Sequence, residues 1–205
     1  TALEFQPEDG RAHYFLGLVY AKAGDVDKAA AEWQEAVRLE PGNARAWRNL
    51  GLALARQGSE TLPRALEGYE TAARLLPRDS RILLELDEIR ERQGVSGRQR
   101  LEALQRQRET VVERDELVAR LVDLLIAEGD HAGALEYLDR HHFNTWEGSY
   151  GIHNAYIEAH VGVAEKSSDP REALAHYLKA CEYPMNLEVA PREPNLRGFL
   201  YYPMA

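Results

Sequence analysis

The apolar residues of the first eighty positions follow a pattern of large and small side chains that occurs twice. The large residue Leu16 is followed by the small residue Gly17, and the same pair returns 34 positions later as Leu50 and Gly51. A glycine and then a proline follow each pair at matching points, where a first helix turns back and a second one ends. The pattern therefore predicts two successive helical hairpins. The matched positions are Leu16 and Leu50, Gly17 and Gly51, Tyr20 and Leu54, Gly24 and Gly58, Ala29 and Ala65, Trp33 and Tyr69, Ala36 and Ala72, and Pro41 and Pro77.

This unit of 34 residues resembles the tetratricopeptide repeat (TPR), a helical hairpin with large and small residues at these positions. A single hairpin of this kind cannot bury its own apolar face, so hairpins stack and form one concave surface along the stack. The resemblance implies an all-α fold, a right-handed TPR superhelix. The 205 residues of the chain have room for about five helical hairpins.

The pattern divides the chain into successive parts of one solenoid fragment. Phe5 and Pro7 match Leu39 and Pro41 at the repeat distance, so we expect residues 1–7 to be the end of a truncated repeat and the chain to be a fragment of a longer protein. The expected parts that follow are repeat one at 10–43, repeat two at 44–79, a degenerate repeat three at 80–114, repeat four at 115–142, a loop with repeat five at 143–187, and a C-terminal tail at 188–205.

Repeat three departs from the pattern in two ways. Asp87 stands where repeat one has the small Gly17, so we expect looser packing between its helices. Residues 95–114 are rich in arginine, glutamate and glutamine, and we expect one long solvated helix stabilised by opposite charges three or four positions apart.

The second half also resembles a narrower group, the C-terminal region of large bacterial proteins with an N-terminal β-rich domain of uncharacterised function. The resemblance covers about residues 80–200 and rests mainly on the runs 143–151 and 183–187, which contain Phe143, Trp146-Glu147-Gly148 and Pro184-Met185-Asn186-Leu187. It implies that this chain accompanies another domain. It carries no catalytic residues over to this sequence.

Composition excludes several classes of protein. The formal net charge of −9 does not favour nucleic acid as a partner, and no apolar stretch approaches the roughly 20 residues of a membrane span. The single cysteine, Cys181, excludes an internal disulfide and follows an apolar run, so we expect a buried thiol. We expect a cytoplasmic protein.

No arrangement of residues indicates an enzyme. The sequence has no nucleophile elbow and no glycine-rich phosphate loop. His141, His142, His153 and His160 lie near Glu147, but their spacing matches no zinc signature. We therefore expect no catalytic residue, no metal site and no cofactor.

The loop residues Trp146 and Glu147 form a candidate loop site with two interpretations. An aromatic ring and a carboxylate on a flexible loop could contact a sugar or a peptide. Alternatively, Trp146 packs beneath the loop and Glu147 caps the following helix. The second interpretation is favoured.

The concave surface is the main candidate binding site. In a TPR hairpin the second, fifth, ninth, twelfth and thirteenth positions of the first helix line this groove. In the first three repeats these positions are rich in arginine, which pairs with carboxylates in a two-pronged geometry. We expect an acidic segment to bind there, unless these arginines pair with neighbouring acids. The candidate groove residues are Arg11, Tyr14, Leu18, Lys22, Arg45, Arg48, Leu52, Arg56, Arg81 and Arg92.

Three hypotheses for function follow. The first is a non-catalytic scaffold that binds a protein, a peptide or another part of its own chain through the arginine-lined groove. The second is an accessory module of a larger carbohydrate-processing protein whose catalytic domain is absent here. The third is self-association, in which exposed repeat ends pair in a homodimer.

Overall fold

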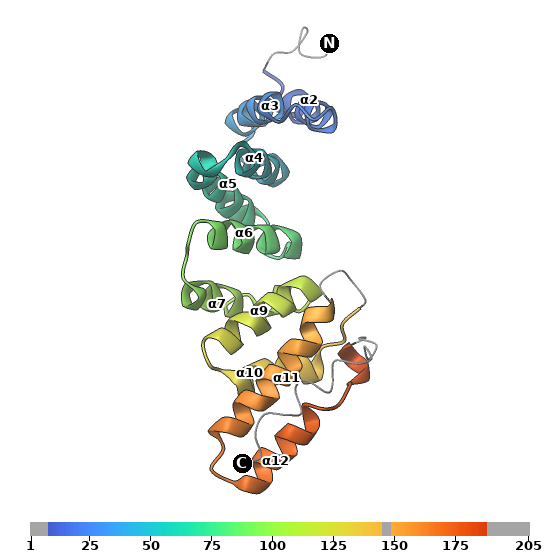
Figure 1. Cartoon of the computed structure of the whole chain (residues 1–205). Coiled ribbons are helices and arrows are strands. Elements are labelled where there is room, and N and C mark those ends of the chain that lie inside the picture. Colours follow the sequence, from blue (N-terminus) through green and yellow to red (C-terminus); the bar gives the residue numbers. More distant parts are fainter. Residues whose placement is uncertain (1–7, 145–148, 188–205) are drawn as a thin grey trace. The chain divides into compact units, whose positions relative to one another are not determined.

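The structure is a computed structural model that describes residues 8–144 and 149–187 (Figure 1). The chain divides into two compact units, residues 1–100 (unit 1) and residues 101–205 (unit 2). Helix α7 (Gly97–Gln105) crosses the boundary between them. Every regular element of the described residues is a helix, which confirms the predicted all-α fold.

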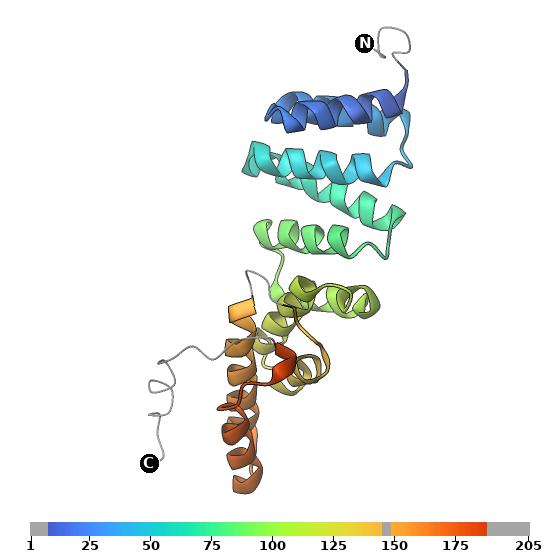
Figure 2. The same ribbon diagram turned by 90° about the vertical axis from the view of Figure 1, so that its right-hand side faces the viewer.

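Unit 1 is a row of helices in which each helix packs on the next one. Helices α2 and α3 form a hairpin, α4 and α5 form a second, and α6 follows (Figures 1 and 2). The first hairpin lies within the expected repeat one and the second within repeat two. The elements are α2 (Gly10–Lys22), α3 (Val26–Leu39), α4 (Ala44–Gln57), the 3-10 helix η1 (Ser59–Thr61), α5 (Leu62–Leu75) and α6 (Ser80–Arg92).

Short polar side chains start most of these helices. Asp9, Asp25, Asn43 and Asp79 each accept a hydrogen bond from a backbone N–H of the first helical turn, which satisfies donors that have no partner within the helix. Gly24 joins α2 to α3 with φ at +83°, a backbone conformation that glycine adopts without steric cost. The glycine turn was thus correctly predicted.

Close packing within each hairpin depends on a glycine beneath an aromatic ring. A Cβ atom on Gly17 would lie 2.4 Å from Nε1 of Trp33, and one on Gly51 would lie 2.9 Å from the Tyr69 ring. Trp33 and Tyr69 are almost completely buried. The large side chain of the second helix therefore occupies space that the first helix leaves open.

The prediction of loose packing at Asp87 was wrong. Asp87 is 1% exposed, and its two carboxylate oxygens accept hydrogen bonds from Nε and Nη2 of Arg100 at 3.0 and 2.7 Å. Arg100 also donates to Glu91 at 2.7 Å. A buried ion pair thus fills the place that glycine and an aromatic ring share in the first two hairpins.

The prediction of one long helix over residues 95–114 was also wrong. Helix α7 ends at Gln105, and the short helix α8 (Arg108–Val111) follows after a turn. Leu104 and Val111 are buried on either side of this turn. The bend brings both apolar residues into the interior, which a straight, solvated helix would not achieve.

Unit 2 contains two further hairpins. Helix α9 (Asp115–Ala127) pairs with α10 (His131–Arg140), and α11 (Ser149–Lys166) pairs with α12 (Pro170–Lys179). Helix α11 also packs on α9 and α10 (Figure 1). Pro170 is the first residue of α12, a position where the fixed φ of proline suits the start of a helix.

The segment after α12 is held against the end of α10. The 3-10 helix η2 (Met185–Leu187) contains Asn186, whose side-chain amide donates to the carbonyls of Leu138 and His141 at 2.7 and 2.9 Å. Its own carbonyl accepts from the backbone N–H of buried Phe143 at 2.7 Å. Asn186 therefore satisfies carbonyls at the C-terminus of α10.

Cys181 is exposed, which contradicts the prediction of a buried thiol. It follows α12, and the apolar residues around it do not enclose it. The expected truncated repeat at 1–7, the loop residues Trp146 and Glu147, and the tail at 188–205 lie outside the described residues.

Candidate functional site

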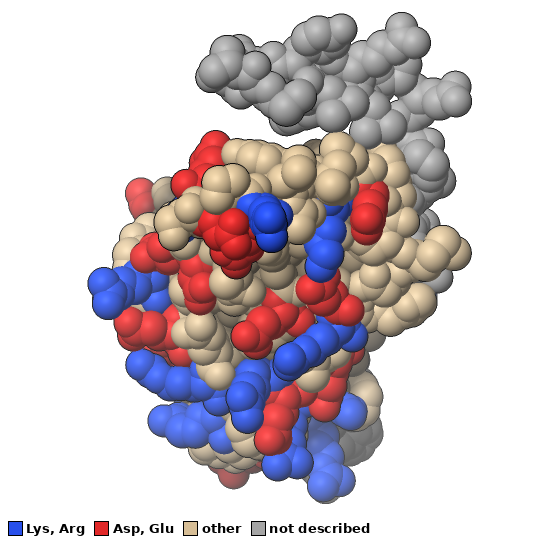
Figure 3. All heavy atoms as spheres, turned by 90° about the horizontal axis from the view of Figure 1, so that it is seen from below, with Lys and Arg blue, Asp and Glu red and all other residues tan. Residues whose placement is uncertain are grey.

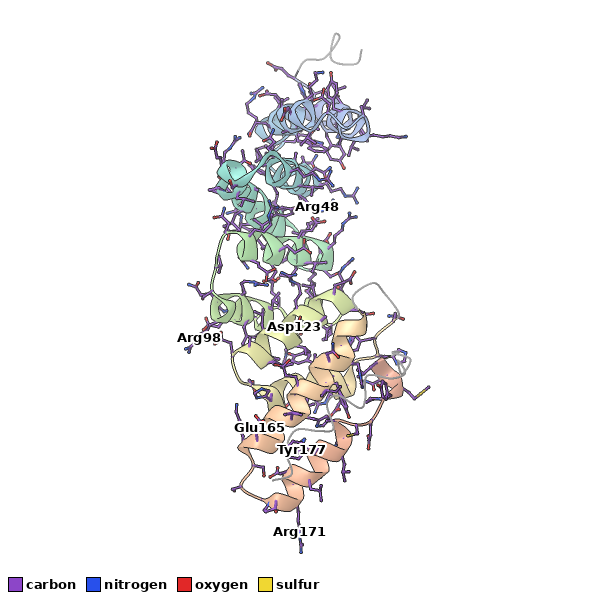
Figure 4. All side chains as sticks on the ribbon, viewed as in Figure 1. Arg48, Arg98, Asp123, Glu165, Arg171 and Tyr177 are labelled. Atoms are coloured by element: carbon purple, nitrogen blue, oxygen red, sulfur yellow. The ribbon has the colours of Figure 1, made fainter. Side chains whose placement is uncertain are left out.

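The candidate groove residues of unit 1 lie on α2, α4 and α6, the first helices of successive hairpins. Helices α2 and α4 lie on one side of unit 1, and α3 and α5 on the other (Figure 1). We call the ten candidate groove residues the basic face of unit 1. Figure 4 labels one of them, Arg48, on α4.

Arg48 is held by an acid from the next hairpin. Its guanidinium donates from Nε to Oε2 of Glu85 at 2.6 Å and from Nη2 to the other carboxylate oxygen. Arg81 donates to the same carboxylate at 3.2 Å. The hydrogen bond to Glu85 raises the pKa of Arg48 above its usual value, so the pair stays ionised.

Arg92 contributes a second link between α4 and α6. Its Nη2 donates to the backbone carbonyl of Ala55 at 2.8 Å. Arg48 and Arg92 thus connect the first helices of two hairpins, and a ligand could reach either guanidinium only by competing with these contacts. For Arg48 and Arg81, the structure shows the pairing with a neighbouring acid that was the alternative to ligand binding.

Four basic side chains of this face extend into solvent. Arg11, Lys22, Arg45 and Arg56 are all exposed. Arg11 lies 3.9 Å from Glu40, with 81% of its side chain exposed, and such a surface pair is weak. These four groups carry the charge that a ligand would meet.

The apolar members of the basic face lie between these charges. Tyr14 and Leu52 are half-buried and pack against the core of unit 1. Leu18 is 38% exposed. The face therefore combines anchored apolar side chains with mobile cationic groups of the kind that bind carboxylates.

Sequence reasoning missed Glu85, the acid that both Arg48 and Arg81 contact. Glu85 follows the fifth position of α6 and does not belong to the five groove positions. Its equivalent in α4 is the buried Asn49, whose side-chain oxygen accepts from Nη1 of Arg48 at 3.3 Å. A glutamate where the preceding repeat has asparagine was the signal that could have revealed it.

Unit 2 presents a second set of groove positions with the opposite charge. The same positions on α9 and α11 include Glu116, Asp123, Glu158 and Glu165, with Lys166 as the one basic residue among them. Figure 4 labels Asp123 on α9 and Glu165 on α11. We call the full set the acidic face of unit 2: Glu116, Ala119, Asp123, Ile126, Ala127, Ala155, Glu158, Gly162, Glu165 and Lys166.

A cavity of about 290 Å³ opens on this acidic face between α9 and α11. Its lining combines carboxylates at Asp123 and Glu158 with small or apolar residues. The groove positions predicted from the sequence did not include these two helices, although the spacing of Gly129 from Gly24 gives the register of α9. The remaining lining residues are Ile126, Ala127, Gly151, Asn154 and Ala155.

Histidines of unit 2 pair with each other and with tyrosines. Nδ1 of His160 lies 2.8 Å from Nδ1 of His176, and His153 stacks on Tyr183 with ring centroids 4.0 Å apart. Burial, with the neighbouring His176 and Lys179, lowers the pKa of His160 to about 4. No group of three or more metal-ligating side chains occurs within residues 8–144 and 149–187.

His141 has a structural contact at the start of α9. Its Nε2 lies 2.7 Å from Asp115, and Asn144 donates to the same carboxylate through its backbone and side chain. Burial alone would raise the pKa of Asp115, but the hydrogen bonds from Asn144 and His141 lower it below its usual value.

No helix among the described residues has the length and apolar character needed to cross a lipid bilayer.

Comparison with known proteins identifies the repeat. A family model described as TPR repeat matches residues 17–58. Tetratricopeptide repeat domain-containing protein PYG7 of Arabidopsis thaliana is 40% identical over 55 residues, which are 27% of this chain and 18% of that protein. Protein O-mannosyl-transferase TMTC1 of Mus musculus is 34% identical over 106 residues, 44% of this chain and 11% of that protein. The chain thus spans less than a fifth of either relative.

Solved structures share the fold over most of the chain. YrrB, described as a TPR protein with an unusual peptide-binding site, has a TM-score of 0.65 at 21% identity, covering 91% of this chain and 94% of that one. PilF of Pseudomonas aeruginosa has a TM-score of 0.64 at 21% identity, covering 91% and 83%. MamA has a TM-score of 0.60 at 18% identity, covering 96% of each. These matches confirm the predicted TPR fold of paired helices.

Proposed function

We propose that the chain is a non-catalytic scaffold that binds an acidic peptide segment on the basic face of unit 1. The observation that carries this proposal is the exposure of Arg11, Lys22, Arg45 and Arg56 around half-buried Tyr14 and Leu52. A protein with a net charge of −9 keeps these cations together on the first helices of its hairpins. Such a face attracts carboxylates and repels other basic surfaces.

The contacts of Glu85 support the same chemistry. A carboxylate of the chain itself already binds Arg48 and Arg81 on this face. The geometry around Arg48 therefore suits a carboxylate from the neighbouring hairpin, and the exposed arginines beside it offer similar groups to an external one. YrrB, which shares the fold, is described as having a peptide-binding site, and this likeness supports a peptide as the ligand class.

The test uses the full chain and a synthetic peptide of alternating glutamate and leucine. The variant carrying Arg45→Glu and Arg56→Glu should bind the peptide at least about tenfold more weakly than the wild type. Neither arginine has a hydrogen bond to another described residue, so the fold should remain intact. Arg48 is left unchanged because its loss would remove the two-pronged, part-buried partner of Glu85 and leave that carboxylate only its contact with exposed Arg81.

The control variant carries Arg38→Glu and Arg74→Glu, which make the same change in net charge. Both residues are exposed on the second helices α3 and α5. Titration calorimetry at about 0.15 M salt should show near wild-type affinity for this control. An equal loss of peptide affinity in both variants would mean that the net charge of the chain alone determines binding. Unchanged affinity in both variants would show that the basic face is not the binding site.

The accessory-module hypothesis remains a second prediction. It depends on the resemblance of residues 80–200 to large bacterial proteins with a β-rich domain. Trp146 and Glu147, the residues that could contact a sugar, lie outside the described residues. The structure gives a different role to two residues of the same resemblance, because Asn186 and Phe143 fasten η2 to the end of α10.

A further inference from the structure

Helix α12 carries large apolar side chains that the described residues of unit 2 leave exposed. Leu174, Tyr177 and Leu178 are 55%, 44% and 60% exposed, and Cys181 is also exposed. Leu174, Tyr177 and Leu178 follow the spacing of zero, three and four, so they share one face of the helix, and Cys181 lies in the turn that follows it. We call the four residues the α12 stripe. Tyr177 is labelled in Figure 4, and Figure 3 shows uncharged surface (tan) beside the mixed charges at this end of the molecule.

The same face is covered in the second helices of other hairpins. Counted from the capping aspartate, Leu174 is equivalent to Ala30 in α3 and to Leu135 in α10, which are 6% and 7% exposed. In each of those hairpins a following helix packs on the second helix, α4 on α3 and α11 on α10. Cys181 is likewise equivalent to Val37, which is 2% exposed. The α12 stripe thus corresponds to a stacking face that no helix within residues 8–144 and 149–187 covers.

We propose that the segment 196–202 of the same chain covers the α12 stripe. This segment reads Leu-Arg-Gly-Phe-Leu-Tyr-Tyr and is the most apolar part of the residues that follow Leu187. It lies between Pro194 and Pro203, residues that interrupt regular structure and so delimit it. Covering the exposed leucines removes apolar surface from water, worth about 25 cal/mol per Å².

The chain between Leu187 and Leu196 is long enough for the segment 196–202 to reach the α12 stripe. Eight residues separate Leu187 from Leu196, and an extended chain spans up to about 3.3–3.6 Å per residue. Tyr183 is anchored by its stack on His153 of α11, the helix on which α12 packs. The origin of the connecting chain therefore lies within the same unit as the stripe.

An attached segment is also favoured over a second copy of the chain. A short flexible connection holds a segment at an effective concentration on the order of millimolar. A separate molecule at micromolar concentration would have to bind far more tightly to compete. The segment 196–202 thus has a concentration advantage before any difference in contacts is considered.

Cys181 provides a direct probe of this contact, since it is the single cysteine of the chain. The rate of its reaction with a thiol reagent of the disulfide type should be low in the full chain. The variant carrying Phe199→Asp and Leu200→Asp should react at least tenfold faster, because charged residues would not cover the stripe. The matched control, Val189→Asp with Ala190→Asp, places the same charges in the connecting chain and should react like the wild type.

A second variant removes the other side of the contact and leaves the tail unchanged. Leu174→Asp should also raise the rate at Cys181, and far-UV circular dichroism establishes that the helices remain. Equal rates in the wild type and in the Phe199→Asp, Leu200→Asp variant would overturn the proposal. Protection of the wild type that disappears on dilution would also overturn it, because it would identify a second copy as the cover.

Discussion

The two units place their groove residues at the same positions of the TPR hairpin but give them opposite charge. The solvent-exposed charges of the basic face of unit 1 are Arg11, Lys22, Arg45 and Arg56, whereas the acidic face of unit 2 has carboxylates at Asp123 and Glu158 around a cavity. The repeat therefore determines which positions lie on the candidate faces, and only the individual side chains determine the charge of each face. One chain can present unlike surfaces on one architecture.

The interiors of the hairpins differ in a similar way. In unit 1 a glycine faces an aromatic ring at Gly17 with Trp33 and at Gly51 with Tyr69. The equivalent positions of the first hairpin of unit 2 hold Val122 and Leu138, both fully buried. Val122 is larger than the glycines of unit 1, and Leu138 is smaller than the aromatic residues. The hairpins thus keep a similar combined volume at the two positions with different residues.

The largest effect is expected at α6, where Asp87 replaces the glycine of the first two hairpins and pairs with Arg100 of α7. Arg100→Met removes the guanidinium that pairs with buried Asp87 and should lower the free energy of unfolding by about 3–5 kcal/mol. Adding Asp87→Gly restores the residue found in the first two hairpins and should recover most of that loss. Urea denaturation measures both, and a loss below about 1 kcal/mol for the single variant would contradict the structural role of the pair.

A smaller effect tests the exchange of volume directly. Gly17→Val should lower the free energy of unfolding by about 1–3 kcal/mol, since its side chain would overlap the Trp33 ring. The double variant with Trp33→Leu reproduces the residue types of Val122 and Leu138. Its loss should be smaller than the sum of the two single losses in a double-mutant cycle, and additive losses would show that the two positions do not share space.

Acid should lower the free energy of unfolding of unit 2 through the buried histidine His160. The pKa of His160 is lowered to about 4 in the folded chain, compared with about 6.5 for an unperturbed histidine. Between these values the unfolded chain binds the proton more readily, so stability is complete above pH 6.5 and falls as the pH approaches 4. The loss should be at most about 3 kcal/mol, because one pKa unit corresponds to about 1.4 kcal/mol.

The variant His160→Leu should reduce the dependence of the free energy of unfolding on pH between 6.5 and 4. Leucine is the residue that the first hairpin has at the equivalent position, Leu16. Urea denaturation at successive pH values provides the measurement. His176 and Lys179, the two titratable neighbours that contribute to the low pKa of His160, remain in the variant. An unchanged pH dependence would show that His160 is not the responsible group.

The smallest effect is expected from the acidic face. Asp123→Asn with Glu158→Gln should change the affinity of the acidic peptide by less than about threefold, because neither carboxylate belongs to the proposed binding face and exposed charges are screened by salt. Titration calorimetry with the same peptide gives the answer. A larger gain in affinity would show that overall charge controls binding.

The sequence predicted the helical hairpins of unit 1 well because large and small residues at fixed spacing determine how two helices meet. It failed at Asp87, since its partner Arg100 lies in a stretch without the repeat pattern and only the folded chain brings the two together. It also failed to separate paired from exposed arginines. Arg48 and Arg45 occupy equally ranked groove positions, and only the placement of Glu85 distinguishes them.

A titration of the isotopically labelled full chain with the glutamate–leucine peptide, followed by NMR of the backbone amides, tests the central claim most directly. Shifts are expected at the basic face of unit 1, around Tyr14, Lys22, Leu52 and Arg56, with little change around Asp123 and Glu158. Shifts centred on the acidic face, or spread evenly over both units, would contradict the account.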